Sequence, residues 1–378
     1  MLTRRGLMWA AGLSVAAPVL AAPRYRGPNV VMIRFGGGVR RREVIESSTT
    51  FAPWFVNELV PQGSLFRDVR IEDLGDVTQT SHAQGTLYLL TGRYDGYRDV
   101  GGQFLGERFE PAVPTLPEYL RRAHPDVADH QCLIVNGEDR KNEEYLTFSN
   151  DHDFGIEYRS NTLSLARFKR YLIDQQLLEG RFAGTELTIK QRELDSLRKL
   201  DYRNAEPHGQ GDTLERFWSG WRRQYGDSGL KNPRGDRLLT TLALRALEQL
   251  APKFMLVNYQ DPDYVHWGNP AHYTRAIGVI DAGIREITAA IDSLPTYRDN
   301  TILVVVPDCG RDDNRFQRVP YQHHFNSRSA HEVFAFFRGP GIGAGRVFDS
   351  RANQIDVTAT IAALMGVRAP RAEGRVLV

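Results

Sequence analysis

Only two cysteines, Cys132 and Cys309, occur among the 378 residues, so a disulfide scaffold is excluded. An excess of charge of one sign is also lacking. The formal net charge of +2 gives no reason to expect nucleic acid or another polyanion as a partner. Beyond Leu20 no apolar run is long enough to cross a bilayer, which predicts a mature chain without a membrane anchor. The length suits one large domain with a sizeable core.

The first residues have the pattern of an export signal. A paired arginine, Arg4-Arg5, precedes an Ala-rich apolar run that ends near Leu20, and this run is too short to span a bilayer comfortably. Small residues at Ala21 and Ala22 suit signal peptidase. We predict a twin-arginine-type signal over residues 1–21, with an ordinary Sec signal as the alternative. The remainder, residues 22–378, is then a single domain located in the periplasm or outside the cell.

A buried strand followed by an acidic residue is the most informative local feature. The β-branched run Ile302–Val306 predicts a parallel strand, and Asp308 and Gly310 follow at its C-terminal end. In open α/β sheets, ligands and metals bind at that edge. The alternative is a strand exit at which Asp308 caps the next turn.

Strand and helix patterns alternate on both sides of a charged, helical insertion at about 140–235. Before the insertion we predict a helix at Thr115–Arg122. After it we predict a helix at Arg237–Leu250, a strand at Phe254–Tyr259 and a helix at Tyr273–Leu294. The insertion itself contains amphipathic helical patterns, and we treat it as a cap rather than as a separate domain.

Six segments resemble, in the same order, motifs of the alkaline phosphatase and sulfatase superfamily. They are Asn29–Arg40, Thr80–Tyr94, Phe254–His266, Asp308–Gly310, His331–Ile342 and Ile355–Val367. The resemblance implies a three-layer α/β/α sandwich with a mostly parallel central sheet and a helical cap over the active site. It also implies metal-dependent hydrolysis of phosphate or sulfate esters.

The resemblance implies one metal site made by Asp263, His266 and a later histidine. Because the spacing departs from the family pattern, Asp261 is an alternative to Asp263. For the later histidine we favour His324, followed by His331 and then His323; adjacent histidines in extended backbone point in opposite directions. Zinc suits a carboxylate and two imidazoles, with calcium or manganese as alternatives.

A second metal site of the family looks degraded. Asp308 matches the family, but Gly36-Gly37-Gly38 stands where the first-strand Asp is expected, and Cys309 stands in place of a His. As a thiolate, Cys309 could still bind zinc. The glycines could form an anion cradle or a tight turn with positive φ.

The nucleophile of the family aligns with His82, or with Ser81 if the alignment shifts by one residue. His82 could attack, act as a base or bind metal. Ser81 and Thr80 are also good N-caps, which is the structural alternative. Arg40, Arg93 and Arg311 are candidates for contact with the substrate anion, although loop arginines are commonly solvated.

These observations predict an exported metal-dependent hydrolase of a small anionic ester. The alternatives are a catalytically degenerate member that binds a ligand or partner, and an envelope transferase of phospho-groups. Fold alone does not choose among them. The sequence indicates neither the substrate nor the oligomeric state.

Overall fold

A computed structural model describes residues 24–72, 74, 80–100, 109–137, 146–199, 211–231, 235–313, 321–323 and 327–378. The predicted signal peptide and His324 lie outside these residues. The main sheet has nine strands in the order β10-β2-β9-β8-β1-β7-β5-β6, and β11 pairs with β2. Only β9 runs antiparallel to its neighbours. The predicted mostly parallel sheet is therefore confirmed.

The strands of this sheet are β1 (Asn29–Arg34), β2 (Ser64–Arg70), β5 (Cys132–Asn136), β6 (Asn161–Leu163), β7 (Phe254–Asn258), β8 (Thr301–Val306), β9 (Glu332–Arg338), β10 (Arg346–Phe348) and β11 (Ala352–Asn353). A separate hairpin pairs β3 (Tyr97–Asp99) with β4 (Phe109–Pro111). The helices are α1 (Arg42–Ile45), α2 (His82–Thr91), α3 (Leu116–Ala123), α4 (Leu165–Leu178), α5 (Gly184–Lys199), α6 (Gly211–Tyr225), α7 (Asp236–Leu250), α8 (Pro270–Ser293) and α9 (Asp356–Met365). Short 3-10 or π turns are η1 (Phe55–Leu59), η2 (Val60–Gln62), η4 (Asp129–Gln131), η6 (Gly155–Tyr158), η8 (Asp261–Tyr264) and η9 (Arg328–His331).

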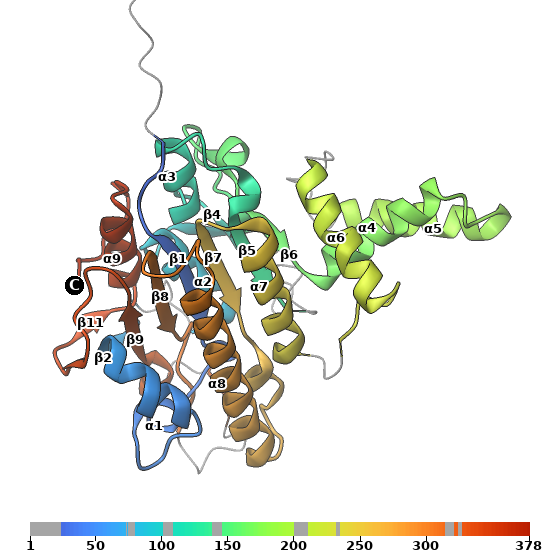
Figure 1. Ribbon diagram of the computed structural model, residues 1–378. Helices are drawn as coiled ribbons and strands as arrows, with labels where there is room; N and C mark the ends of the chain where they lie inside the picture. The colour runs from blue at the N-terminus through green and yellow to red at the C-terminus, as the bar shows by residue number, and fades with distance from the viewer. Residues whose placement is uncertain are drawn as a thin grey trace, which may run out of the picture.

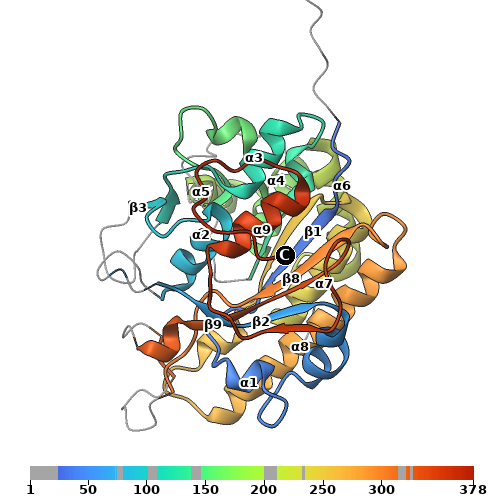
Figure 2. The ribbon, with the colours of Figure 1, turned by 90° about the vertical axis from the view of Figure 1, so that its left-hand side faces the viewer.

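Helices cover both faces of the sheet (Figures 1 and 2). Alternate residues of β1 enter different cores, because successive side chains of a strand point to opposite faces. Val31 and Ile33 pack in the core that contains α7 and α8. Val30 and Met32 pack in the core that contains α2, α3 and α9. Two apolar cores separated by one sheet make the predicted three-layer sandwich.

The inserted helices α4, α5 and α6 extend beyond the β6 end of the sheet (Figure 1). Phe168 of α4 and Trp218 and Trp221 of α6 are buried and anchor this unit to the core that also contains α7. The predicted helices are present. That they cover the active site stays a prediction. Among the described residues, no helix combines the length and apolar character that crossing a bilayer would take.

One buried carboxylate holds together the start of α3 and the segment before β6. Glu118 accepts hydrogen bonds from the backbone N–H groups of Thr115, Ser149 and Gly155, at 2.7, 3.0 and 2.9 Å. The Thr115 and Ser149 hydroxyls donate to it as well. Burial raises the pKa of Glu118 above its usual value, although these hydrogen bonds oppose the shift.

We therefore expect Glu118→Ala to lower the free energy of unfolding by roughly 3 kcal/mol or more, because several buried donors lose their acceptor. Glu118→Gln keeps the shape and one acceptor oxygen, so it should cost less. Urea titration monitored by circular dichroism measures both changes. The exposed Glu157→Ala is the control and should change stability by no more than about 0.5 kcal/mol. Equal losses in the Glu118→Ala and Glu157→Ala variants would contradict the argument.

Candidate active site

The C-terminal ends of β1, β7 and β8 lie side by side, with Arg34 in register with Asn258 and Val306. Asp308 follows β8 here and is fully buried. Its Oδ1 accepts from the Cys309 N–H at 2.8 Å, and its Oδ2 lies 2.6 Å from Nδ1 of His82. The strand predicted from Ile302–Val306 thus delivers Asp308 to the expected edge.

His82 is the first residue of α2, and its ring lies between two carboxylates. Nδ1 faces Asp308, while Nε2 lies 2.7 Å from Oδ1 of Asp263. Burial alone would lower the pKa of His82, but Asp263 and Asp308 raise it well above its usual value. Without a metal, these two carboxylates therefore favour the imidazolium form of His82.

Ser81 is the N-cap of α2. Its hydroxyl accepts from the Gln84 N–H at 3.3 Å and donates to the Gln84 side-chain oxygen at 2.6 Å. The capping role that the sequence offered as an alternative is therefore present, and it directs the hydroxyl toward Gln84.

Three imidazoles converge on one carboxylate oxygen. The Nε2 atoms of His82, His266 and His323 lie 2.7, 3.1 and 3.2 Å from Oδ1 of Asp263. These residues come from the start of α2, the segment around η8 and the segment before β9. Burial alone would raise the pKa of Asp263, but the three histidines, with His82 first, hold it well below its usual value.

A divalent metal fits this arrangement. The ligand atoms of Asp263, His266 and His323 lie within 4.8 Å of one another, and a carboxylate with imidazoles is a set that zinc prefers. Nδ1 of His323 lies 2.8 Å from the carbonyl oxygen of Thr80, to which it donates in the tautomer that leaves Nε2 with a lone pair. Such outer hydrogen bonds orient histidine ligands in metal sites.

His323, which the sequence ranked last, is the later histidine that reaches the cluster. His331 lies instead at the end of β2, where its Nδ1 is 2.9 Å from the Ile71 carbonyl oxygen and its own carbonyl oxygen accepts from the Ile71 N–H. His324 lies outside the described residues. The contacts of His323 with Thr80, which is distant in sequence, could not be seen from spacing.

Asp261 does not point into the histidine cluster in the way Asp263 does. Its Oδ1 accepts from the Asp236 N–H at 3.1 Å and so contacts the start of α7. The buried Asp236 carboxylate in turn accepts from the backbone N–H groups of Gln260 and Asp261. Burial, and then the charge of Asp261, raise the pKa of Asp236 well above its usual value. Of the two predicted ligands, the geometry favours Asp263.

Arg34 lies where the degraded second site was predicted, and the sequence reading missed it. Its Nη1 lies 3.6 Å from Oδ2 of Asp308, and it donates to the hydroxyl of Thr86. A β-carbon at Gly36 would lie 2.9 Å from Nε of Arg34 and 1.8 Å from the Tyr259 carbonyl oxygen. A side chain at position 36 would therefore collide first with the Tyr259 backbone and then with the guanidinium of Arg34. An arginine inside the apolar run of β1 was the available signal, because a buried cation needs a partner.

Two further changes accompany Arg34. Cys309 is buried with Sγ 3.8 Å from Nδ1 of His82, and burial raises the pKa of its thiol to about 11. A neutral thiol supplies no anionic ligand in the metal-free protein. Gly37 and Gly38 have φ of 82° and 68°, as a tight turn with positive φ requires.

Arg311 is buried and holds the surrounding loops rather than facing solvent. Its guanidinium donates to five backbone carbonyl groups, those of Gly37, Gly38, Pro262, Val265 and Tyr321. Arg40 donates to the Asp312 carbonyl oxygen at 2.7 Å and stacks over the Tyr321 ring at 4.7 Å. Arg93 pairs with Asp95 and Glu373 near the surface. These contacts give Arg311 a positioning role. Arg40 and Arg93 are bonded to protein groups rather than directed at the histidine cluster.

Replacing His323 by Ala should weaken zinc binding by roughly 100-fold or more, because one converging imidazole is lost. His331→Ala should bind zinc as the parent protein does. Isothermal titration of metal-depleted protein gives both affinities, and the exposed His272→Ala is the matched control. A comparable loss in His331→Ala would show that the wrong histidine has been assigned.

Replacing Arg311 by Lys should weaken zinc binding by about tenfold or more, since a single ammonium group does not reproduce five contacts made by a planar guanidinium. The same titration measures the effect. Arg42→Lys, at an exposed position, makes the same chemical change away from the site. Unchanged zinc affinity in Arg311→Lys would mean that the loops keep their geometry without the hydrogen bonds of the Arg311 guanidinium.

No family model matches the sequence, and none of the curated proteins matches it. Solved structures do. A protein of the alkaline phosphatase superfamily from Vibrio parahaemolyticus gives a TM-score of 0.55 at 17% identity, over 94% of this chain and 70% of that chain. A putative sulfatase from Bacteroides thetaiotaomicron VPI-5482 gives 0.56 at 13% identity, over 93% and 73%. A phosphonate monoester hydrolase from Silicibacter pomeroyi gives 0.52 at 15% identity, over 93% and 76%. At these low identities the likeness establishes the fold: the chain has the fold of the alkaline phosphatase and sulfatase superfamily.

Proposed function

We propose that this chain is an exported, metal-dependent hydrolase of phosphate or sulfate esters. The observation that carries the proposal is the convergence of three imidazoles on Oδ1 of Asp263 at the C-terminal edge of the sheet. Ligands bind at this edge in open α/β sheets. The structural neighbours named above include a putative sulfatase and a phosphonate monoester hydrolase, which agrees with an ester of sulfur or phosphorus.

Asp263, His266 and His323 would hold one divalent ion. When bound, that ion supplies a Lewis acid for an ester oxygen and lowers the pKa of water. Asp308 keeps the ring of His82 fixed through Nδ1, so that Nε2 faces the same space. With an ion bound to Asp263, neutral His82 carrying its proton on Nδ1 would accept a proton at Nε2 from the water whose oxygen bonds to phosphorus or sulfur. The bond from phosphorus or sulfur to the leaving oxygen breaks, and this oxygen takes up a proton.

Arg34 supplies a fixed positive charge behind this pair. Burial alone would raise the pKa of Asp308, but His82 and Arg34 hold it below its usual value, so Asp308 stays ionised. An ionised Asp308 stabilises the imidazolium that His82 forms when it takes the proton. One metal together with a guanidinium would thus supply the positive charge around the reacting group.

The rival is a catalytically degenerate protein that binds a ligand or partner. The specific observation in its favour is the loss of ligands at the second site, where Arg34 crowds Gly36 and Cys309 is buried. Retention of the three-histidine cluster favours the hydrolase, because a protein that only binds a ligand has no need of it.

The test is turnover of aryl phosphate, phosphonate and sulfate esters by protein loaded with zinc, manganese or calcium. We expect at least one ester class to be hydrolysed. Asp263→Asn and His82→Ala should each lower kcat/KM by about 10²–10⁴-fold, because they remove a metal ligand and the proton acceptor. His272→Ala, an exposed histidine, should keep the activity.

Two outcomes would end the hydrolase proposal. Absence of stoichiometric metal from natively exported protein removes its chemical basis. Stoichiometric metal without turnover of any of the three ester classes would favour the binding protein. Equal activity in His82→Ala would leave hydrolysis standing but would reject the role given to His82.

A further inference from the structure

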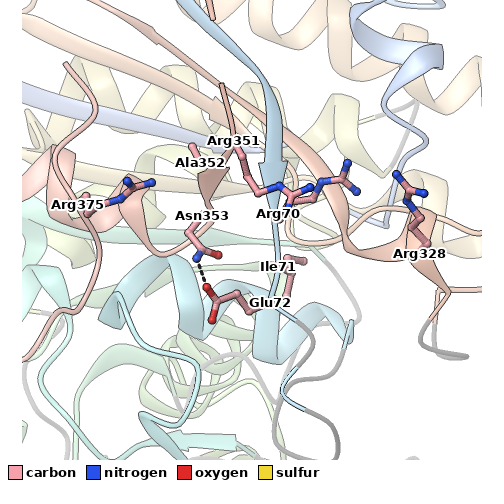
Figure 3. A pocket seen from close by; sticks show the side chains of 8 residues that line it. All are labelled: Arg70, Ile71, Glu72, Arg328, Arg351, Ala352, Asn353 and Arg375. Carbon is pink, nitrogen blue, oxygen red and sulfur yellow. Dashed lines mark hydrogen bonds between the residues drawn. The ribbon is translucent and has the colours of Figure 1, made fainter. Parts of the chain in front are cut away.

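A cavity of about 630 Å³ lies at the ends of β2 and β11, away from the histidine cluster (Figure 3). Its charged lining consists of four arginines and one glutamate. The lining residues are Arg70, Ile71, Glu72, Arg328, Arg351, Ala352, Asn353 and Arg375. We call this cavity the arginine pocket. Four guanidinium groups around one concave space are a strong local concentration of positive charge in a chain whose net charge is only +2.

Carboxylates behind the lining orient part of this arginine set. Asp68 pairs with Arg70 at 2.7 Å and lies 3.8 Å from Arg351. Glu332 pairs with Arg328 at 3.0 Å and also with Arg70. The lining carboxylate, Glu72, accepts from the side-chain amide of Asn353 (Figure 3). Arg70 is thus held in a defined position between two acidic residues.

Arg351 and Arg375 keep most of their donor capacity for a ligand. Their side chains are 73% and 74% exposed. Arg351 lies 3.8 Å from Asp68, and Arg375 lies 3.7 Å from Asp356, so both ion pairs are longer than a hydrogen bond. Each guanidinium carries five N–H donors in a planar fork that matches sulfate, phosphate and carboxylate groups.

The arginine pocket and the metal cluster share one edge of the sheet. β2 and β8 both run antiparallel to β9, so the ends of β2 and β8 point to the same side. The metal ligands Asp263 and His266 follow β7, which lies four strand positions from β2, so about 19 Å separates the ends of these two strands. Backbone hydrogen bonds also connect the segment after β8 with the arginine pocket through η9. Gly310, beside Cys309, donates its N–H to the Ala330 carbonyl oxygen, and His331 is hydrogen-bonded to Ile71 of the pocket.

We propose that the arginine pocket binds a second anionic group of the substrate, so that the substrate carries at least two sulfate, phosphate or carboxylate groups. This inference rests on the proposed ester hydrolysis at the metal cluster. An extended polyanion would place one ester at Asp263 and another anionic group, further along the same molecule, among Arg70, Arg351 and Arg375. Sulfated and phosphorylated chains offer the same chemistry to a guanidinium, and the probes below separate them.

The first measurement is binding, which needs no turnover. We would titrate the metal-loaded protein with size-fractionated dextran sulfate, with neutral dextran of the same length, and with polyphosphate. Arg351→Ala/Arg375→Ala should lower the affinity for at least one of the two polyanions by about tenfold or more. The control is Arg216→Ala/Arg223→Ala, which removes two exposed charges from α6 and should change the affinity less than about twofold.

The second measurement compares substrates. If the metal cluster hydrolyses esters, the ratio of kcat/KM for a polyanionic ester to that for a small aryl ester should fall about tenfold in Arg351→Ala/Arg375→Ala. Arg351→Gln, a single and milder change, should shift the ratio in the same direction if the double variant fails to fold.

If Arg216→Ala/Arg223→Ala lost as much polyanion affinity as the pocket variant, the effect would be general electrostatic attraction, and the proposed subsite would be rejected. Equal binding of neutral dextran would overturn it as well. A protein that hydrolyses no ester, yet loses polyanion binding only in the pocket variant, would reject the proposed hydrolysis while leaving the anion pocket in place.

Discussion

The guanidinium of Arg311 is the constraint on which the site depends. It lies just beyond β8 and donates to carbonyl groups of the loop after β1, the segment around η8 and the residue Tyr321. Two of these three segments carry Asp263, His266 and His323. Loops usually lie at the surface with mobile backbones, but five donors on one rigid plane fix three of them relative to one another. The convergence of His266 and His323 on Asp263 depends on this fixed backbone.

Charge balance explains why the rest of the site differs from the family pattern. Asp308 and Asp263 are both anionic and both touch His82, so positive charge must be supplied nearby. Arg34 supplies part of it permanently, and its side chain crowds the space that a carboxylate at position 36 would fill. The remaining deficit lies at Asp263, where a divalent ion fits between the imidazoles. The same reasoning connects three differences from the family pattern. The expected Asp is missing, Cys309 is a neutral thiol, and the buried cation Arg34 takes the place of a second metal as a source of positive charge.

Local signals were enough to predict most of the fold and part of the site. The β-branched run Ile302–Val306 predicted β8, and the acidic residue after it was placed at the correct edge. Local patterns also predicted β7 and α3, whereas α2 was expected from the family resemblance. The pairing of Asp263 with His266 was implied by the family resemblance, with Asp261 as the alternative to Asp263. The choice of His323 over His331 could not, because it depends on Thr80 and Ile71, which lie about 240 and 260 residues earlier in the chain. The contacts of Arg34 and Arg311 could not be predicted for the same reason: their partners are backbone carbonyls and side chains that only the tertiary fold brings together.

The net charge of the chain does not describe the local charge at the arginine pocket. A value of +2 says that acidic and basic residues are nearly equal in number, but association with an anion depends on the local potential. The fold brings Arg70, Arg328, Arg351 and Arg375 to one cavity from four separate segments. The carboxylates that could neutralise them are partly shared: Asp68 serves both Arg70 and Arg351, and Glu332 serves both Arg70 and Arg328. Counting Glu72 and Asp356, four carboxylates lie beside the four arginines, so donors remain for a ligand mainly on the exposed Arg351 and Arg375, whose carboxylate partners are beyond hydrogen-bond distance. An anionic ester approaching either place would be attracted to both, which favours a substrate with several anionic groups over one with a single group.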